Sequence, residues 1–277
     1  MSRIQTNTAA YGAYRSLTLT QSNMEKSIEK LSSGFRINRA ADDAAGAAIA
    51  NDLRSTGRSL QAAQRNASQA NSVLQIADGA VSTISTILDR MKELATSAAS
   101  DSSGTTGRAN LDAEYQQLVA EIDRITATTK YQGSSLLDGT YTGTFLVSSS
   151  GDYAGNDAIV VDGTTLKMDS TTLLGAAAGD LTSLGNAQTE LGKIDTAITA
   201  VGTAIGTIGA GESRIQYATT NVASTFENVQ SAESVIRDTD MAYEMTQFTK
   251  YQILQQAGTA MLAQANQAPQ SILKLLQ

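Results

Sequence analysis

Two pairs of acidic residues are the first side chains in this sequence that could do chemistry. Asp42 adjoins Asp43, and Asp238 is close to Asp240. Paired carboxylates could hold a metal ion or exchange protons. However, the chain has no histidine and no cysteine, and no other residue suited to ligation is near either pair in the sequence. We therefore predict no catalytic residue and no metal site, and we interpret the four aspartates as residues that favour the start of a helix.

A glycine-rich stretch, GTIGAGES at residues 206–213, is the second feature that could suggest chemistry. Phosphate-binding loops need the spacing G-x-x-x-x-G-K-[ST] or G-x-G-x-x-G, and this stretch has neither. Glycines at close contacts between helices explain it better, so we predict no cofactor. The net charge of -7 and the lack of basic clusters interleaved with aromatic residues also argue against binding to nucleic acid.

The sequence offers no segment for a membrane. The first residues, MSRIQTNTAAYGAYRSLTL, lack the continuous apolar region of a secretory signal peptide. No stretch of about 20 predominantly apolar residues could span a bilayer. We expect no membrane insertion, and we expect that any export proceeds without a cleaved signal peptide.

Long helices are the elements that this sequence favours most strongly. The single proline, Pro269, is near the end of the chain, so most of the sequence has no helix breaker. From Ile49 to Ala98 apolar residues recur in steps of four and three, interrupted only by Thr56, which predicts a seam about 75 Å long. The same spacing predicts a second helix over 111–125 and a third over 184–236, whose stripe includes Ile205.

Between the second and third helices, at about 133–185, the composition changes to Gly, Ser, Thr and Asp. Two short apolar runs, TFLVS at 144–148 and AIVV at 158–161, stand on either side of SSGDYAGND. This pattern predicts a β-hairpin with a long turn. The middle of the chain is therefore a small β-rich excursion from a helical rod.

Both ends of the chain are predicted to be helical. Near the N-terminus large apolar residues recur at roughly heptad spacing up to Phe35, with Gln21 filling a gap, and Gly34 is expected to stop that helix. The segment from Tyr251 to Leu273 has no charged residue. A helix that is uncharged all round must be buried in protein. We expect the N-terminal segment to cover part of it and other copies of the chain to cover the rest.

These observations define a fold class and a domain organisation. The protein is predicted to be mainly α, with a long-helix coiled-coil-like rod and a small β-hairpin region, plus N- and C-terminal helices that pair as a separate coiled-coil layer. The expected domains are a terminal helical domain, residues 1–43 with 238–277, and a rod domain, residues 44–237, with its β-rich excursion at about 133–185.

Two terminal segments resemble the signatures of bacterial flagellins. They are LSSGFRINRAADDAAGAAIA at residues 31–50 and QILQQAGTAMLAQANQAPQSILKLLQ at residues 252–277. The likeness covers roughly residues 1–140 and 186–277. It implies a structural subunit, not an enzyme, that self-polymerises into the extracellular bacterial flagellar filament used for motility. It also implies that the terminal helices form an inner tube, and the short central region implies that no large outer domains are present.

The resemblance also implies partners and site residues. The partners are other copies of the chain, the flagellar export apparatus, an export chaperone, and cap and junction proteins. The apolar residues of the terminal helices are expected to pack between subunits: Leu17, Met24, Ile28, Leu31, Phe35, Met245, Phe248, Ile253, Leu254, Met261, Leu262 and Ile272. The surface recognised by the flagellin-sensing Toll-like receptor of animals is matched by Arg90, Glu93, Leu94 and Glu114, whereas Asp89 and Ser97 depart from the family pattern.

Three other interpretations of the sequence stay open at this point. The stripes with steps of four and three are also typical of the core of a monomeric helical bundle. A hook-filament junction protein of the same superfamily would have the same termini but would cap a filament. A cytoplasmic signalling coiled coil has a similar Ala-, Ser- and Gln-rich composition, but it predicts a helical hairpin without a β excursion.

Overall fold

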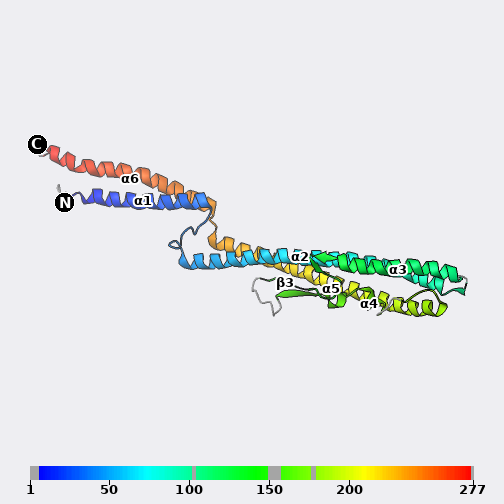
Figure 1. Ribbon diagram of the computed structural model, residues 1–277. Coiled ribbons are helices and arrows are strands. Elements are labelled where there is room, and N and C mark those ends of the chain that lie inside the picture. Colours follow the sequence, from blue (N-terminus) through cyan, green and yellow to red (C-terminus); the bar gives the residue numbers. More distant parts are fainter. Residues whose placement is uncertain (1–5, 102–103, 149–156, 176–178, 276–277) are drawn as a thin grey trace. The chain divides into compact units, whose positions relative to one another are not determined.

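The computed structural model describes residues 6–101, 104–148, 157–175 and 179–275, and for 268–275 it describes only the backbone. Within these ranges the helices are α1 (Thr8–Ser33), α2 (Ala44–Ala98), α3 (Thr105–Thr128), α4 (Ser170–Leu173), α5 (Leu184–Arg237) and α6 (Met241–Leu275) (Figure 1). The chain divides into two compact units. We call residues 1–56 with 228–277 the terminal unit, and residues 57–227 the bundle unit.

Most of the predicted long seam, from residue 57 onward, belongs to the bundle unit. Helix α2 has 55 residues, and every predicted seam position from Leu60 to Ala98 is buried. At Ile49 the prediction is wrong, because Ile49 is 52% exposed while Ala50 is 2% exposed, and Leu53 of the predicted stripe is half-buried. There the buried face is made by small residues, Gly46, Ala50 and Gly57. Gly46 packs against the turn before α2, where a Cβ atom would lie 2.7 Å from Ile37 Cδ1.

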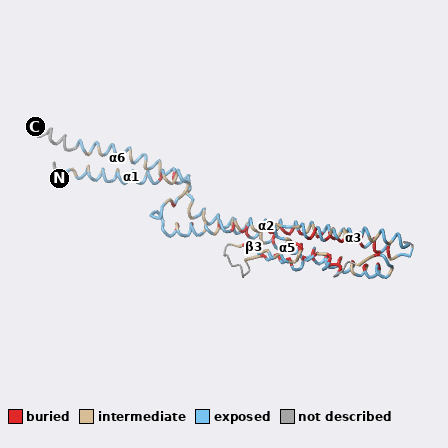
Figure 2. The backbone as a smooth tube through the Cα atoms, viewed as in Figure 1, coloured by how far each residue is buried: buried red, intermediate tan, exposed pale blue. Residues whose placement is uncertain are grey.

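Helices α3 and α5 complete the bundle against α2. In α3 the predicted residues Tyr115, Ile122 and Ile125 are buried. In α5, which has 54 residues, the buried face again includes small residues, and Ile205 of the predicted stripe is 38% exposed while Ala204 is fully buried. The buried positions of α5 are Ala187, Glu190, Ile194, Ala197, Val201, Ala204, Ile208, Ile215 and Val222. Figure 2 shows buried residues running along α2, α3 and α5 of this unit.

A β-hairpin packs on the bundle unit, as the sequence predicted. Strand β3 (Thr142–Leu146) pairs with β4 (Ala158–Asp162) in antiparallel register, with Thr144 opposite Val160. Most of the predicted turn, residues 149–156, is outside the described residues. A smaller pair, β1 (Lys130–Tyr131) with β2 (Ser134–Ser135), precedes it, and a 3-10 helix (Gly163–Leu166) follows β4. The hairpin argues against the signalling coiled coil, which predicts no such strands.

The terminal unit is built on α1 and α6, which run antiparallel. Asn7 contacts Ala265 at one end of the pair, and Ser27 contacts Glu244 toward the other. Gly34 ends α1 with a left-handed φ of 75°, as predicted. Beyond it, residues 35 and 238 form an isolated antiparallel β-bridge between the chain segments that leave α1 and enter α6. In the described residues no helix is long and apolar enough to cross a membrane.

Candidate subunit-packing surface

The contact between α1 and α6 is a coiled-coil seam made largely of small and polar residues. Half-buried or buried positions recur in steps of three and four along both helices. Gly258 allows a close approach, since a Cβ atom at this position would lie 3.2 Å from Leu17 Cδ1. On α1 the seam positions are Ala10, Ala13, Leu17, Thr20, Met24, Ser27 and Leu31, and on α6 they are Glu244, Phe248, Tyr251, Gln255, Gly258, Leu262 and Ala265.

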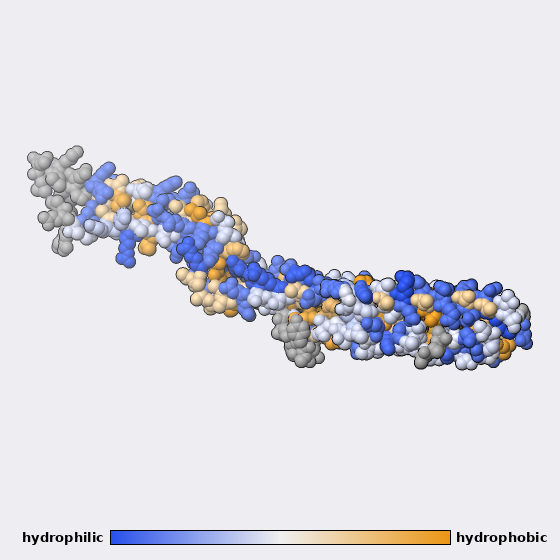
Figure 3. Space-filling view, viewed as in Figure 1, coloured by the Kyte–Doolittle hydropathy of each residue, from blue (hydrophilic) through white to orange (hydrophobic). Residues whose placement is uncertain are grey.

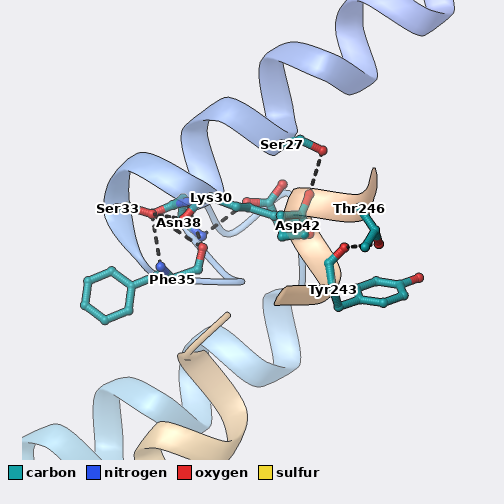
Figure 4. A network of polar contacts seen from close by, with 9 residues as sticks. Ser27, Lys30, Ser33, Phe35, Asn38, Asp42, Tyr243 and Thr246 are labelled. Carbon is teal, nitrogen blue, oxygen red and sulfur yellow. Dashed lines mark hydrogen bonds and ion pairs between the residues drawn. The ribbon is translucent and has the colours of Figure 1, made fainter. Parts of the chain in front are cut away.

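A polar cluster closes the seam at the C-terminal end of α1 (Figure 4). The Ser27 hydroxyl donates to Glu244 Oε1 across 2.6 Å, and Lys30 Nζ lies 3.7 Å from Glu244 Oε2. Ser27 is 2% exposed and Glu244 is 7% exposed, so this carboxylate is buried but has both a hydrogen bond and a counter-ion. Such a group is acceptable inside a seam only while both partners remain.

Other large apolar side chains lie on the outside of the α1–α6 pair, away from its seam. On α6, Ile253 is 60% exposed, Leu254 43% and Met261 63%. Figure 2 shows few buried residues along these helices, and Figure 3 shows apolar residues at the surface over them. The exposed apolar side chains of the two helices, here called the outer apolar face, are Tyr11, Tyr14, Leu19, Ile28, Met241, Tyr243, Met245, Ile253, Leu254 and Met261.

The predicted packing residues are therefore divided between the seam and the outer apolar face. Ile28, Met245, Ile253, Leu254 and Met261 belong to the outer apolar face. The side chain of Ile272 is outside the described residues. The other predicted residues are half-buried within the terminal unit: Leu17, Met24, Leu31, Phe35, Phe248 and Leu262.

Two details of the predicted N-terminal stripe are wrong. Gln21 and Ile28 are exposed, whereas Thr20 and Ser27 occupy the seam in their place. The antiparallel partner decides this, because Ser27 has Glu244 opposite it and apolarity alone could not reveal that hydrogen bond. The prediction also missed half of the outer apolar face: Tyr11, Tyr14, Leu19, Met241 and Tyr243. The sequence could have identified them, because they are large apolar residues that lie outside the stripe with steps of four and three.

Three of the four predicted receptor-surface residues lie together on the bundle unit. Arg90 Nη2 lies 2.8 Å from Glu114 Oε1, and Arg90 Nη1 lies 2.9 Å from Glu93 Oε2. The hydrogen bond that Arg90 donates to Glu114 is the main cause that raises the pKa of the Arg90 guanidinium. Leu94 is only 3% exposed and belongs to the core, so its assignment to a surface is wrong. Its place in the stripe of α2, beside Ala95, explains the burial.

The aspartate pairs have structural roles. Asp43 Oδ1 accepts from the backbone N–H of Gly46, and Asp240 Oδ1 accepts from those of Ala242 and Tyr243, which starts α2 and α6 as predicted. Asp42 instead accepts from the backbone of the preceding turn, and the Arg39 N–H lowers the pKa of its carboxyl group. Within the described ranges no group of three or more acidic side chains is placed to hold a metal ion.

Comparison with known proteins is consistent along the whole chain. Residues 4–142 match the bacterial flagellin N-terminal helical region, and residues 191–276 match the bacterial flagellin C-terminal helical region. The flagellin of Halalkalibacterium halodurans is 41% identical over 99% of both chains, and that of Bacillus subtilis is 37% identical over the same shares. The crystal structure of Bacillus cereus flagellin is similar to this chain with a TM-score of 0.50 and 33% sequence identity. The similarity covers 61% of this chain and 94% of the Bacillus cereus chain.

The shared regions include both helices of the terminal unit and the long helices of the bundle unit. With its outer apolar face and its two terminal signatures, the chain belongs to the bacterial flagellins, the subunits that polymerise into the extracellular flagellar filament used for motility.

Proposed function

We propose that the outer apolar face of α1 and α6 is the surface through which copies of this flagellin pack into the filament. The observation that carries the proposal is the exposure of Ile253, Leu254 and Met261 in a segment without any charged residue. Large exposed apolar patches mark interaction sites in soluble proteins. The chain itself leaves this surface uncovered, and the partner of a homopolymer is a second copy.

The energies involved are large enough to decide assembly. Fully burying a Leu, Ile or Met side chain is worth about 1.5 to 3 kcal/mol. The outer apolar face of each subunit has seven such residues and three tyrosines. Burial of even a few of them would lower the critical concentration by orders of magnitude, because about 1.4 kcal/mol changes an equilibrium tenfold.

The proposal extends to the domain organisation. Residues 1–43 and 238–277 would form the inner layer of the filament, and residues 44–237 a surrounding layer. Two features support this division. The chain interrupts its helices at 34–43 and at 238–240. In addition, α1 and α6 expose many large apolar residues, whereas the bundle unit buries a large apolar core of its own.

We propose further partners by analogy with other members of the family. We include export by the flagellar export apparatus with a chaperone, without a cleaved signal peptide, and contact with cap and junction proteins. For the animal Toll-like receptor we retain the exposed cluster of Arg90, Glu93 and Glu114 as the recognised surface, without Leu94. The exposed fractions of these three side chains, 49%, 68% and 45%, leave them accessible.

The test substitutes single residues of the outer apolar face. Ile253→Asp and Met261→Asp should each abolish sedimentable filament under conditions where the parent chain assembles. Ile253→Leu, which keeps an apolar side chain, should assemble normally. Circular dichroism should show the same helix content in all soluble chains. If Ile253→Asp sediments as the parent does, this face is not the packing surface.

Electron microscopy of the concentrated parent chain tests the remaining alternative. A propagating subunit should form long, uniform helical filaments by itself. A hook-filament junction protein should form none, because it caps a filament. Short oligomers that do not extend into filaments would contradict the proposal.

A further inference from the structure

Three of the seven methionines have exposed side chains on one helix. Met241, Met245 and Met261, all on α6, are 47%, 50% and 63% exposed. The two methionines of the bundle unit are buried, since Met91 is 0% and Met168 is 2% exposed. Small solutes can therefore reach the thioether sulfur atoms of α6 but not those of the bundle core.

We infer that Met241, Met245 and Met261 are a modification site at which two-electron oxidants of the peroxide class stop polymerisation. The sulfur lone pair attacks one oxygen of hydrogen peroxide, so an S–O bond forms and the O–O bond breaks. The proton on the transferred oxygen passes to the departing hydroxide, which leaves as water. The sulfur is oxidised to the sulfoxide and the peroxide is reduced.

The consequence follows from the surroundings of these residues. A sulfoxide is polar and accepts hydrogen bonds, so its burial in an apolar contact without a donor is unfavourable. Met241 and Met245 are four residues apart and thus lie on the same side of α6, so their modification affects one patch. The inference rests on the proposed function, because the polarity of these side chains matters to assembly only if assembly buries them.

The experiment treats the purified, unassembled full-length chain with hydrogen peroxide. Peptide mass spectrometry follows each methionine, and sedimentation follows filament yield. Met241, Met245 and Met261 should be oxidised at least about tenfold faster than Met91 and Met168, because susceptibility follows exposure. Filament yield should fall in step with the sulfoxide content of α6. Equal rates at all five methionines, or undiminished assembly of the oxidised chain, would overturn the inference.

Reduction of the methionine sulfoxides provides a second experiment, which needs no variant protein. Methionine sulfoxide reductases of both stereospecificities, with dithiothreitol, return the sulfoxide to the thioether while the dithiol is oxidised to a disulfide and water is released. Filament yield should recover with the thioether. If the methionines are restored and assembly is not, the loss came from other damage and the inference fails.

Two triple variants at 241, 245 and 261 separate this inference from the proposed function. The Met→Leu variant removes the oxidisable sulfur atoms while it keeps side-chain volume and apolarity. Its filament yield after peroxide treatment, measured relative to its own untreated yield, should stay high, whereas that ratio should fall for the parent. If it loses assembly on treatment as the parent does, the oxidation site is wrong while the packing face stands. The Met→Gln variant imitates the polar sulfoxide without oxidant. If it assembles as well as the parent, these residues are not buried in the filament, and the proposed packing face is wrong at that point.

Discussion

The side-chain amide of Asn7 donates from Nδ2 to the backbone carbonyl oxygen of Ala265 across 2.7 Å, which joins the start of α1 to α6. In α6 the residue four positions further on is Pro269, which has no N–H to donate to that carbonyl. Asn7 thus supplies the donor that the proline removes. Its Oδ1 atom also accepts from the N–H of Ala10 at 3.0 Å, so the same side chain caps α1.

This double role predicts a rescue. Asn7→Asp keeps the capping oxygen but loses the donor, and it should lower the stability of the helix pair in the filament by about 1 kcal/mol. In a Pro269→Ala background residue 269 has its own N–H, so Asn7→Asp should lower the stability of the helix pair by less. The measurement is the midpoint of thermal filament dissociation for all four chains of this double-mutant cycle. Additive losses would show that Asn7 does not replace the missing donor.

The antiparallel register of α1 and α6 can be tested by a disulfide. A Cβ atom at position 258 would lie 3.8 Å from Leu17 Cβ, which is within the range of natural disulfides. The chain has no cysteine, so Leu17→Cys with Gly258→Cys introduces the only two thiols. Mild oxidation of the assembled protein should form the intramolecular disulfide in most chains.

The matched control for this cross-link is Leu17→Cys with Leu254→Cys. Leu254 is one helical turn away from Gly258 and is 43% exposed, on the outer apolar face. It should give little intramolecular disulfide. A higher yield from the control pair than from the 17/258 pair would mean that the register of the two helices is wrong.

Gly179 is expected to be intolerant of any side chain. A Cβ atom there would lie 2.1 Å from Glu190 Oε1, whose carboxylate is buried in the bundle unit. Gly179→Ala should lower the free energy of unfolding by about 1 to 3 kcal/mol through overpacking. Gly192→Ala is the control, because nothing lies within 4 Å of its Cβ position on α5. It should be neutral or stabilising by up to about 1 kcal/mol. Urea unfolding of both variants checks the difference.

The same buried carboxylate predicts a loss of stability in alkali. The Tyr115 hydroxyl donates to Glu190 Oε2 at 2.9 Å, and burial, followed by this hydrogen bond, raises the pKa of Tyr115 far above its usual value of 10.0. In the unfolded chain Tyr115 loses its proton near pH 10, whereas in the folded chain it keeps it. This contribution to stability is therefore complete below pH 10 and declines above it, by up to about 1.4 kcal/mol per pH unit.

Unfolding in urea at several pH values above and below 10 measures this effect. Tyr115→Phe should show a shallower decline with pH than the parent chain, although it is less stable overall. Tyr217→Phe is the control, because Tyr217 is 78% exposed, and its pH dependence should equal that of the parent. Equal slopes for Tyr115→Phe and the parent would contradict a protonated Tyr115 in the fold.

The sequence predicted the helices and the hairpin well, but it predicted their buried faces only in part. Leu88 and its neighbours on α2 follow a long regular period, and all of them are buried as predicted. Ile49 and Ile205 fit the same period by size, yet Ala50 and Ala204 are the buried neighbours. The reason is geometric, because a pattern read from one helix does not contain the surface of the partner against which it packs.

The sequence by itself determined the secondary-structure elements and the protein family. The period of the apolar residues, the stop at Gly34 and the terminal signatures depend only on residues close together in the chain, so the helices, the hairpin and the filament subunit could be predicted from them. Tertiary structure alone decided which side of each terminal helix faces its partner. Ser27 enters the seam because Glu244 lies opposite it, and this leaves Ile28 on the outside. That choice depends on contacts between residues more than two hundred positions apart, which no local pattern encodes.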